Sequence, residues 1–365
     1  GIKQYINDEN LEEVEWLLIS VEAVMSNKEE IFLRELSVKL YNDSKRLESL
    51  EKKIKKSELK FKSISYHFSC FKEWKNAFLK TKIEKDDEVV IQFPPINHTL
   101  FFAGLIKKYV KKGATIKLLI HDMEILRTAT RDDISLLKKF RINFEEKKTL
   151  KAASSIIVHN SSMLKKLISL GITKDKLINL KIFDYLIEDK GKIYKNRLAT
   201  KDDPVIIAGA LRKHKAGYVY NLPSNVNFNL YGVGYDDSKK DNINYFGSYP
   251  ADNLPFELFG SFGLVWDGMS SETCKGSFGE YLRINNPHKT SLYLASGIPV
   301  IIWSKAALAE FIEKNKCGIT VDSLYEIADK LKSMTDKEYE DIKKNVQAIS
   351  PKLKNGYYTK KSIEA

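Results

Sequence analysis

The chain is poor in cysteine, has no apolar run of membrane-spanning length, and lacks two common glycine-rich nucleotide-binding motifs. Cys70, Cys274 and Cys317 are far apart, which argues against a disulfide framework and a zinc site. No apolar run approaches the roughly 18 residues that a membrane span needs, and no basic stretch followed by an apolar one opens the sequence. We therefore expect a cytoplasmic protein. The lack of G-x-G-x-x-G and G-x-x-x-x-G-K-S/T argues against dinucleotide oxidoreductases and nucleotide hydrolases.

Basic residues outnumber acidic ones. The chain has 60 Lys and Arg against 48 Asp and Glu, a formal net charge of +12, and many of the lysines fall in Lys45–Lys62. Each lysine near an anionic leaflet contributes about 1 kcal/mol. Peripheral contact with the inner face of the plasma membrane is one interpretation, and a solvated helix face is the other. No nucleic-acid-binding motif accompanies these residues, and we expect no nucleic-acid partner.

The length of 365 residues predicts two domains, because it exceeds the usual size of one hydrophobic core. Short apolar runs alternate with helical patterns, which is typical of doubly wound α/β domains with parallel sheets. We expect an N-terminal Rossmann-like domain at residues 1–187, a charged linker at 188–203 and a C-terminal Rossmann-like domain at 204–345. A last helical segment, residues 346–365, is expected to cross back to the first domain.

Residues 1–85 are the atypical, helix-rich part of the first domain. The expected elements there are a first strand at Ile2–Ile6 or Trp16–Val21 and helices at Glu29–Leu40 and Lys45–Lys56. Further strands of this domain are expected at Val89–Phe93, Ile116–Ile120, Ser155–His159 and Lys181–Leu186, with helices at Leu100–Lys111, Phe144–Ala153 and Ser161–Leu170. The second domain is expected to contain strands at Val205–Ile207, Phe228–Tyr231, Ile243–Phe246, Gly263–Trp266, Val300–Trp303 and Gly318–Val321, and helices at Ala306–Lys314, Leu324–Met334, Asp336–Ile349 and from Tyr357 onward.

The segment between the strands at Gly263–Trp266 and Val300–Trp303 carries the strongest functional signal. Pro287 and Gly297 predict the two ends of a short helix that begins at the carboxyl side of the sheet. The exposed N–H groups and the dipole at such a helix start favour a phosphate. Lys289, in the first turn, would add a full positive charge.

The same segment carries a family resemblance. WDGMSSETCKGSFGEYLRINNPHKTSLYLASGIPVIIW, which begins at Trp266, resembles bacterial β-1,6-galactofuranosyltransferases and glucosyltransferase-3-like enzymes. Further similarity lies in IHDMEILR from Ile120, KIFDYLI from Lys181 and AGALRKHK from Ala208. The resemblance covers roughly residues 86–355. It implies a GT-B glycosyltransferase, in which two Rossmann-like domains face a cleft and the second binds a UDP-sugar.

Several residues of the second domain are candidates for donor binding. Lys289 is the strongest, because a cation that strengthens its contact with the leaving diphosphate lowers the barrier. The resemblance implies a diphosphate contact for Lys213 and a uracil-stacking role for Tyr249. A carboxylate near the sugar or ribose hydroxyls is expected of GT-B donor sites, and we assign it to Glu280, with Asp267 expected to orient its loop. The full donor set is Gly209, Arg212, Lys213, Tyr249, Glu280, His288, Lys289 and Thr290.

The acceptor side is expected after the strand Ile116–Ile120. A β-linked product from an α-linked donor implies inversion, so a carboxylate must take the proton of the attacking hydroxyl. Asp122 is the first candidate and Glu124 the second; the alternative role for Asp122 is a carboxylate that caps the next segment. His121 and Arg127 are candidates for contact with the acceptor, and Arg127 suits an anionic one.

No histidine or carboxylate group has the spacing of a metal site, since Asp132-Asp133 and Asp236-Asp237 are adjacent pairs. We therefore predict metal-independent transfer of galactofuranose from UDP-galactofuranose to a lipid- or protein-linked saccharide in cell-surface polysaccharide assembly, with no cofactor. One alternative is a UDP-glucose-dependent glucosyltransferase acting on N-acetylglucosamine of a glycosylated adhesin. Another is a non-catalytic binder of saccharide or nucleic acid. The sequence leaves a homo-oligomer open.

Overall fold

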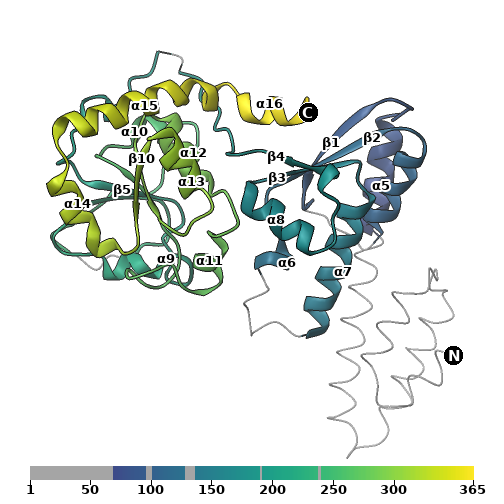
Figure 1. The fold of residues 1–365 in the computed structure, drawn as a ribbon, viewed down its shortest axis with the longest axis horizontal. Coiled ribbons are helices and arrows are strands. Elements are labelled where there is room, and N and C mark those ends of the chain that lie inside the picture. Colours follow the sequence, from purple (N-terminus) through teal and green to yellow (C-terminus); the bar gives the residue numbers. More distant parts are fainter. Residues whose placement is uncertain (1–68, 96–100, 128–135, 190, 237–239) are drawn as a thin grey trace, which may run out of the picture. The chain divides into compact units, whose positions relative to one another are not determined.

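The computed structural model describes residues 69–95, 101–127, 136–189, 191–236 and 240–365 (Figure 1). Residues 69–83 and 101–105 fall in one compact unit, and residues 84–95 and the described residues from 106 onward fall in another. The second unit contains both sheets. The strand expected at Ile2–Ile6 or Trp16–Val21, the helices expected at Glu29–Leu40 and Lys45–Lys56, and the basic segment Lys45–Lys62 lie outside the described residues.

The smaller unit is helical and aromatic. Residues 69–80 form a helix. Its Trp74 ring packs against Phe102, with ring centroids 4.9 Å apart, and against Phe78 at 6.3 Å. Phe102 and Phe78 are both buried, so these rings form the apolar contact that stabilises the described part of this unit.

The first sheet has four parallel strands in the order β1-β2-β3-β4. Residues 116–120 of β2 are all buried, as expected of a strand covered on both faces. Asn160 accepts a hydrogen bond from the backbone N–H of Met163 and caps α8, which confirms the expected helix start there. The elements are β1 (Glu88–Phe93), α5 (Phe102–Lys111), β2 (Thr115–Ile120), α6 (Glu124–Arg127), α7 (Leu136–Ala152), β3 (Ser155–Val158), α8 (Ser161–Ser169), a 3-10 turn (Lys174–Lys176) and β4 (Leu177–Asn179).

Two expectations for this sheet were wrong. The fourth strand is β4, and Lys181–Leu186 is not a strand. Lys181 has φ +74°, a left-handed conformation that interrupts an extended chain. The Asn179 side chain accepts a hydrogen bond from the Lys181 N–H at 2.9 Å and supports this turn. The helix expected at Phe144–Ala153 starts earlier, at Leu136, as α7.

The second sheet has six parallel strands in the order β10-β9-β8-β5-β6-β7. The chain runs outward from β5 through β6 to β7 and then returns to β8 on the other side of β5. Such a reversal of strand order is a topological switch point, where ligands bind outside the carboxyl ends of the strands. The strands are β5 (Val205–Ala208), β6 (Phe228–Tyr231), β7 (Ile243–Tyr245), β8 (Gly263–Val265), β9 (Val300–Trp303) and β10 (Gly318–Val321).

Helices and 3-10 turns cover the second sheet, whose core includes the buried Trp266, Trp303 and Tyr293. The helix expected at Ala306–Lys314 begins at Ala309, and the one expected at Leu324–Met334 begins with a 3-10 turn. The elements are α9 (Lys213–Ala216), α10 (Leu254–Glu257), α11 (Gly276–Tyr281), α12 (His288–Ala295), α13 (Ala309–Asn315), α14 (Ile327–Ser333), α15 (Asp336–Lys354) and α16 (Tyr357–Ile363), with 3-10 turns at Lys195–Leu198, Gly217–Asn221 and Leu324–Glu326.

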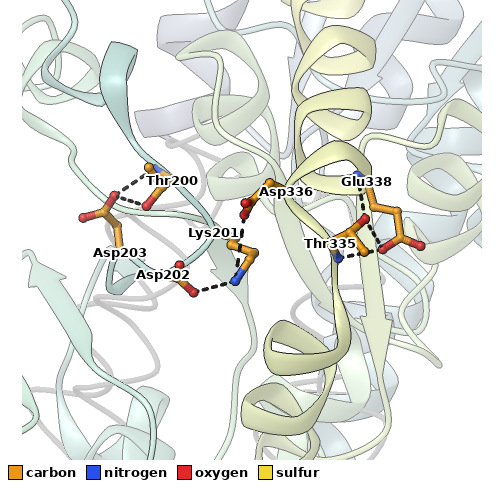
Figure 2. Close-up of polar contacts among 7 residues, drawn as sticks. All are labelled: Thr200, Lys201, Asp202, Asp203, Thr335, Asp336 and Glu338. Atoms are coloured by element: carbon orange, nitrogen blue, oxygen red, sulfur yellow. Dashed lines mark hydrogen bonds and ion pairs between the residues drawn. The ribbon is translucent and has the colours of Figure 1, made fainter.

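The start of α15 is a capping box (Figure 2). The Thr335 side chain accepts from the Glu338 N–H at 3.2 Å, and the Glu338 carboxylate accepts from the Thr335 N–H at 2.7 Å. Asp336, in the first turn, lies 4.0 Å from the Lys201 ammonium, which also bonds Asp202 at 2.7 Å. These contacts bring the segment before β5 to the beginning of the long helix.

The last helix contacts the first sheet. The Asp184 carboxylate accepts from the backbone N–H of Tyr358 at 3.2 Å and of Thr359 at 2.6 Å, at the start of α16. The ammonium of Lys117, a buried residue of β2, donates to the carbonyl of Ile363 at the end of α16. Helix α16 therefore contacts β2 and the segment after β4, and its return to a separate first domain stays a prediction.

Candidate active site

A pocket with a volume of about 340 Å³ opens at the carboxyl ends of β2, β5 and β8. Loops of both sheets line it. His121, Asp122 and Arg127 come from the segment after β2, and Gly209 comes from the end of β5. Pro287, His288 and Lys289 form the start of α12. The pocket thus lies at the switch point of the second sheet, as expected for an α/β ligand site.

The start of α12 suits an anion. Pro287 is its N-cap residue, with extended backbone, and no described side chain caps this helix end. The carbonyl of Pro287 accepts from the Thr290 N–H at 3.0 Å. First-turn N–H groups at such a helix end favour a phosphate or carboxylate group of a ligand.

Lys289 lines the pocket but is already paired. Its ammonium lies 2.9 Å from the Asp267 carboxylate and donates to the Trp266 carbonyl at 2.6 Å. The Lys289 and Asp267 side chains are only 17% and 11% exposed. Asp267 therefore holds Lys289 at the end of β8, and the pair has less net positive charge than a free lysine.

The loop after β5 brings a different lysine to the pocket from the one predicted. Gly209 has φ +136° and lines the pocket with its backbone, which allows close approach of a ligand. Lys213 and Arg212 are not among the lining residues; Lys213 pairs with Asp236 at 3.1 Å in a largely exposed position. Lys215, two residues later in the short helix α9, lines the pocket instead.

Three other predicted donor residues lie outside the pocket lining. Tyr249 is half-buried and packs near the ring of Tyr231, with ring centroids 6.1 Å apart. Glu280 pairs with Arg283 at 2.7 Å, and both side chains are about 40% exposed. Thr290 is fully buried in α12, and its hydroxyl has no hydrogen-bond partner among the described residues.

Asp122 is held from three sides. One carboxylate oxygen accepts from the Met123 N–H at 2.8 Å, and the other lies 2.7 Å from the guanidinium of Arg127. Tyr281 is the third neighbour: burial raises the pKa of its hydroxyl, and the nearby charge and hydrogen bond of Asp122 raise it further. Asp122 and Arg127 both line the pocket.

Glu146 supports this loop and was missed by the sequence analysis. Its carboxylate accepts hydrogen bonds from the backbone N–H groups of Glu124 and Ile125, both at 2.9 Å, at the start of α6. Burial raises the pKa of Glu146 to about 7. The second predicted base, Glu124, belongs to this helix start and is not among the pocket-lining residues. No sequence signal singles out Glu146, since it lies in the charged run EEKK.

Two histidines face the pocket beside a buried ring. His121 and His288 line the pocket, and the ring of Phe183 is nearly parallel to both, at centroid distances of 5.4 and 4.4 Å. Burial lowers the pKa of His121 and of His288. The nearby imidazole of His121 lowers the pKa of His288 further. Both are neutral near pH 7, so each can donate or accept a hydrogen bond with a sugar hydroxyl.

Within the described ranges, no group of three or more His, Cys, Asp or Glu side chains could hold a metal ion. None of the helices in those same ranges is long and apolar enough to cross a membrane. Two parallel α/β sheets with a pocket lined from both are in line with the GT-B fold that the sequence predicted.

Comparisons with known proteins agree with this architecture. A model of the glucosyltransferase 3-like N-terminal domain matches residues 3–182, and the corresponding C-terminal model matches residues 205–365. The chain is 38% identical over 290 residues to the β-1,6-galactofuranosyltransferase WbbI of Escherichia coli, which covers 77% of this chain and 79% of the relative. It is 28% identical over 283 residues to glucosyltransferase 3 of Streptococcus gordonii, with 76% of this chain and 78% of the relative covered.

Solved structures are more distant. HepE of Anabaena in complex with UDP is 12% identical, with a TM-score of 0.47 over 76% of this chain and 78% of that chain. The two domain models and the identity to the E. coli enzyme decide the assignment: the chain belongs to the glucosyltransferase 3-like family of glycosyltransferases.

Proposed function

We propose that this protein is an inverting, metal-independent glycosyltransferase that moves galactofuranose from UDP-galactofuranose to a saccharide acceptor. The identity of 38% to a β-1,6-galactofuranosyltransferase, over most of both chains, carries this proposal. The proposed role is in cell-surface polysaccharide assembly on the cytoplasmic side, with a lipid-linked acceptor at the inner membrane face. The pocket supports the reaction class, since it combines an anion-favouring helix start with a carboxylate on the opposite sheet.

The donor diphosphate is proposed to bind at the start of α12. Backbone N–H groups of that turn, the open backbone at Gly209 and the ammonium groups of Lys289 and Lys215 supply positive potential there. Charge on the leaving UDP increases as its bond to the sugar breaks. Groups already fixed around the diphosphate therefore stabilise the transition state more than the bound donor. Lys289 is fixed in this way by Asp267.

Asp122 is proposed as the general base. The acceptor hydroxyl oxygen attacks the anomeric carbon, the bond from that carbon to the diphosphate oxygen breaks, UDP leaves, and the hydroxyl proton passes to the Asp122 carboxylate. Arg127 and the Met123 N–H orient this carboxylate. A single displacement from the face opposite the diphosphate inverts the configuration and gives a β-linked product from an α-linked donor.

A donor panel tests the proposal. The purified chain is incubated with UDP-galactofuranose, UDP-galactose and UDP-glucose, with and without simple glycoside acceptors. UDP release, product mass, ring size and anomeric configuration are measured, with and without a chelator. We expect acceptor-dependent release from UDP-galactofuranose, a β-linked furanoside, and no effect of chelation. An α-linked product would overturn the inverting mechanism, and loss of activity with chelator would overturn metal independence.

The alternative donor is UDP-glucose, with N-acetylglucosamine of a glycosylated adhesin as acceptor. It is favoured by the identity of 28% to glucosyltransferase 3 of S. gordonii. A pyranoside product from UDP-glucose in the same panel would support it. If no sugar nucleotide is turned over, the non-catalytic binder is favoured, and salt-sensitive nucleic-acid binding would distinguish its two forms.

A further inference from the structure

One buried imidazole connects the two loops that carry the site. His159, directly after β3, is 1% exposed. Its Nδ1 accepts a hydrogen bond from the backbone N–H of Asn286 at 3.0 Å. The ring proton must therefore be on Nε2, which lies 3.0 Å from the carbonyl oxygen of Ile120 and donates to it. The ring thus bridges backbone groups of two segments that are far apart in sequence.

The side chain of Asn286 completes this connection. Its amide nitrogen donates to the His159 carbonyl at 2.6 Å and to the Lys181 carbonyl at 3.1 Å, and its oxygen accepts from the Asn160 amide at 2.7 Å. The Asn160 amide also donates to the Ile284 carbonyl at 2.8 Å. All three polar side chains are at most 5% exposed. A buried network with this many satisfied groups fixes a unique geometry.

The two bridged segments continue directly into the pocket. Ile120 is the last residue of β2, and the chain proceeds to His121 and Asp122. Asn286 precedes Pro287, and the chain proceeds to His288 and Lys289 at the start of α12. A displacement at either bridged peptide would therefore change the separation between the proposed base and the proposed diphosphate site.

We propose that His159 and Asn286 are positioning residues, which hold the loop of Asp122 and the start of α12 at the spacing that sugar transfer requires. This inference rests on the proposed function and adds a positioning role for two buried residues, of which Asn286 lines the pocket and His159 lies outside its lining. Misplacement of reacting groups by about 1 Å can reduce turnover about 100-fold. Burial lowers the pKa of His159 to about 3, so the ring stays neutral and keeps the same bonds throughout the pH range of ordinary assays.

Two matched variants of His159 test its two ring hydrogen bonds separately, one to the Asn286 N–H and one to the Ile120 carbonyl. His159→Gln can keep a donor for the Ile120 carbonyl but offers no acceptor at the Nδ1 position. His159→Asn can keep an acceptor for the Asn286 N–H but cannot reach Ile120. Tyr339→Phe is the control, because it removes one buried hydrogen bond, to the Ser261 carbonyl, away from the pocket.

Turnover and UDP affinity are measured per folded molecule. We expect turnover of both His159 variants to fall about 10- to 100-fold. Their dissociation constant for UDP should stay within about threefold of the parent, because the proposed diphosphate groups all belong to the second sheet. The Tyr339→Phe control should keep both values. Unchanged turnover in both His159 variants, or an equal loss of turnover and UDP affinity, would overturn the positioning role.

Two measurements do not depend on activity. Hydrogen exchange at the Asn286 amide should become at least about tenfold faster in His159→Gln than in the parent, and less so in His159→Asn. Nitrogen NMR of the parent imidazole should show the neutral form with its proton on Nε2. Equal exchange in all three proteins, or a proton on Nδ1, would contradict the bridge. A parent that turns over no sugar nucleotide would instead refute the proposed function.

Discussion

The two sheets contribute different chemistry to one pocket. The second sheet supplies backbone and fixed charge: the start of α12, the open turn at Gly209, and Lys289 paired with Asp267. The first sheet supplies side chains that can exchange protons or bond hydroxyls, chiefly His121 and Asp122. This difference suggests that binding of the donor and reaction with the acceptor can be changed separately by mutation.

Asp122→Asn should have the largest effect. Removal of a general base typically reduces turnover about 100- to 10,000-fold, whereas UDP affinity should stay near that of the parent because the substitution lies on the first sheet. Single-turnover kinetics and UDP titration measure the two quantities. Glu124→Gln is the matched control and should keep turnover within about threefold, since Glu124 is outside the pocket lining. Equal losses in the two variants would leave Asp122 without a special role.

Lys289→Ala should weaken binding of the donor, because Lys289 belongs to the part of the pocket that the second sheet supplies. Loss of a charged hydrogen bond of about 1.5–3 kcal/mol predicts a 10- to 100-fold weaker UDP affinity. Asp267 would also lose its partner, so thermal unfolding should be checked in the same samples. Lys289→Ala with Asp267→Asn removes both charges and separates the two causes. UDP affinity equal to the parent in Lys289→Ala would remove this lysine from the donor site.

Glu146→Gln should change how stability depends on pH. The pKa of Glu146 is raised to about 7 in the folded protein, above its unfolded value. The folded state therefore binds the proton more tightly, and this contribution to stability is present below about pH 4 and lost as pH rises to about 7. The stability of the parent relative to Glu146→Gln should fall by about 2–3 kcal/mol between pH 5 and 8. Denaturant midpoints at several pH values measure this, and a pH-independent difference would contradict the raised pKa.

The smallest effect should distinguish the two lysines of α9. Lys215 lines the pocket, and Lys215→Ala should weaken UDP binding about two- to fivefold. Lys213 is largely exposed and paired with Asp236, and Lys213→Ala should change UDP binding less than twofold. Calorimetric titration at low salt provides the comparison. The reverse order would return the diphosphate contact to Lys213, as the family resemblance implied.

Most of the sheets could be predicted from the sequence, because parallel strands buried on both faces are short apolar runs. Val205–Ala208 and Val300–Trp303 are such strands. The run from Lys181 has the same appearance and is not a strand. Its Ile182 and Phe183 are buried by packing, while the positive φ of Lys181 prevents strand pairing there. The apolar pattern of this run therefore predicted correctly that its residues are buried, but wrongly that they form a strand.

The candidate site was predictable where function follows from position at a strand end or helix start. His121, Asp122, His288 and Lys289 occupy such positions, and all line the pocket. The buried residues that hold the site loops in place could not be predicted from their positions in the sequence. Glu146 lies 21 and 22 residues from the amides that it accepts from, and His159 lies 127 residues from Asn286. A single sequence carries no signal that pairs residues over such separations.

The return of α16 to the first sheet has a mechanical consequence. The chain passes from the first sheet to the second once, before β5, and comes back along α15 and α16 to Asp184 and Lys117. Two chain crossings therefore connect the sheets, one before β5 and one through α15 and α16. Shortening the chain before Tyr357 would remove the second crossing and leave the buried ammonium of Lys117 without the Ile363 carbonyl. An affinity tag fused directly after Ile363 is therefore expected to disturb the contact between the end of α16 and β2.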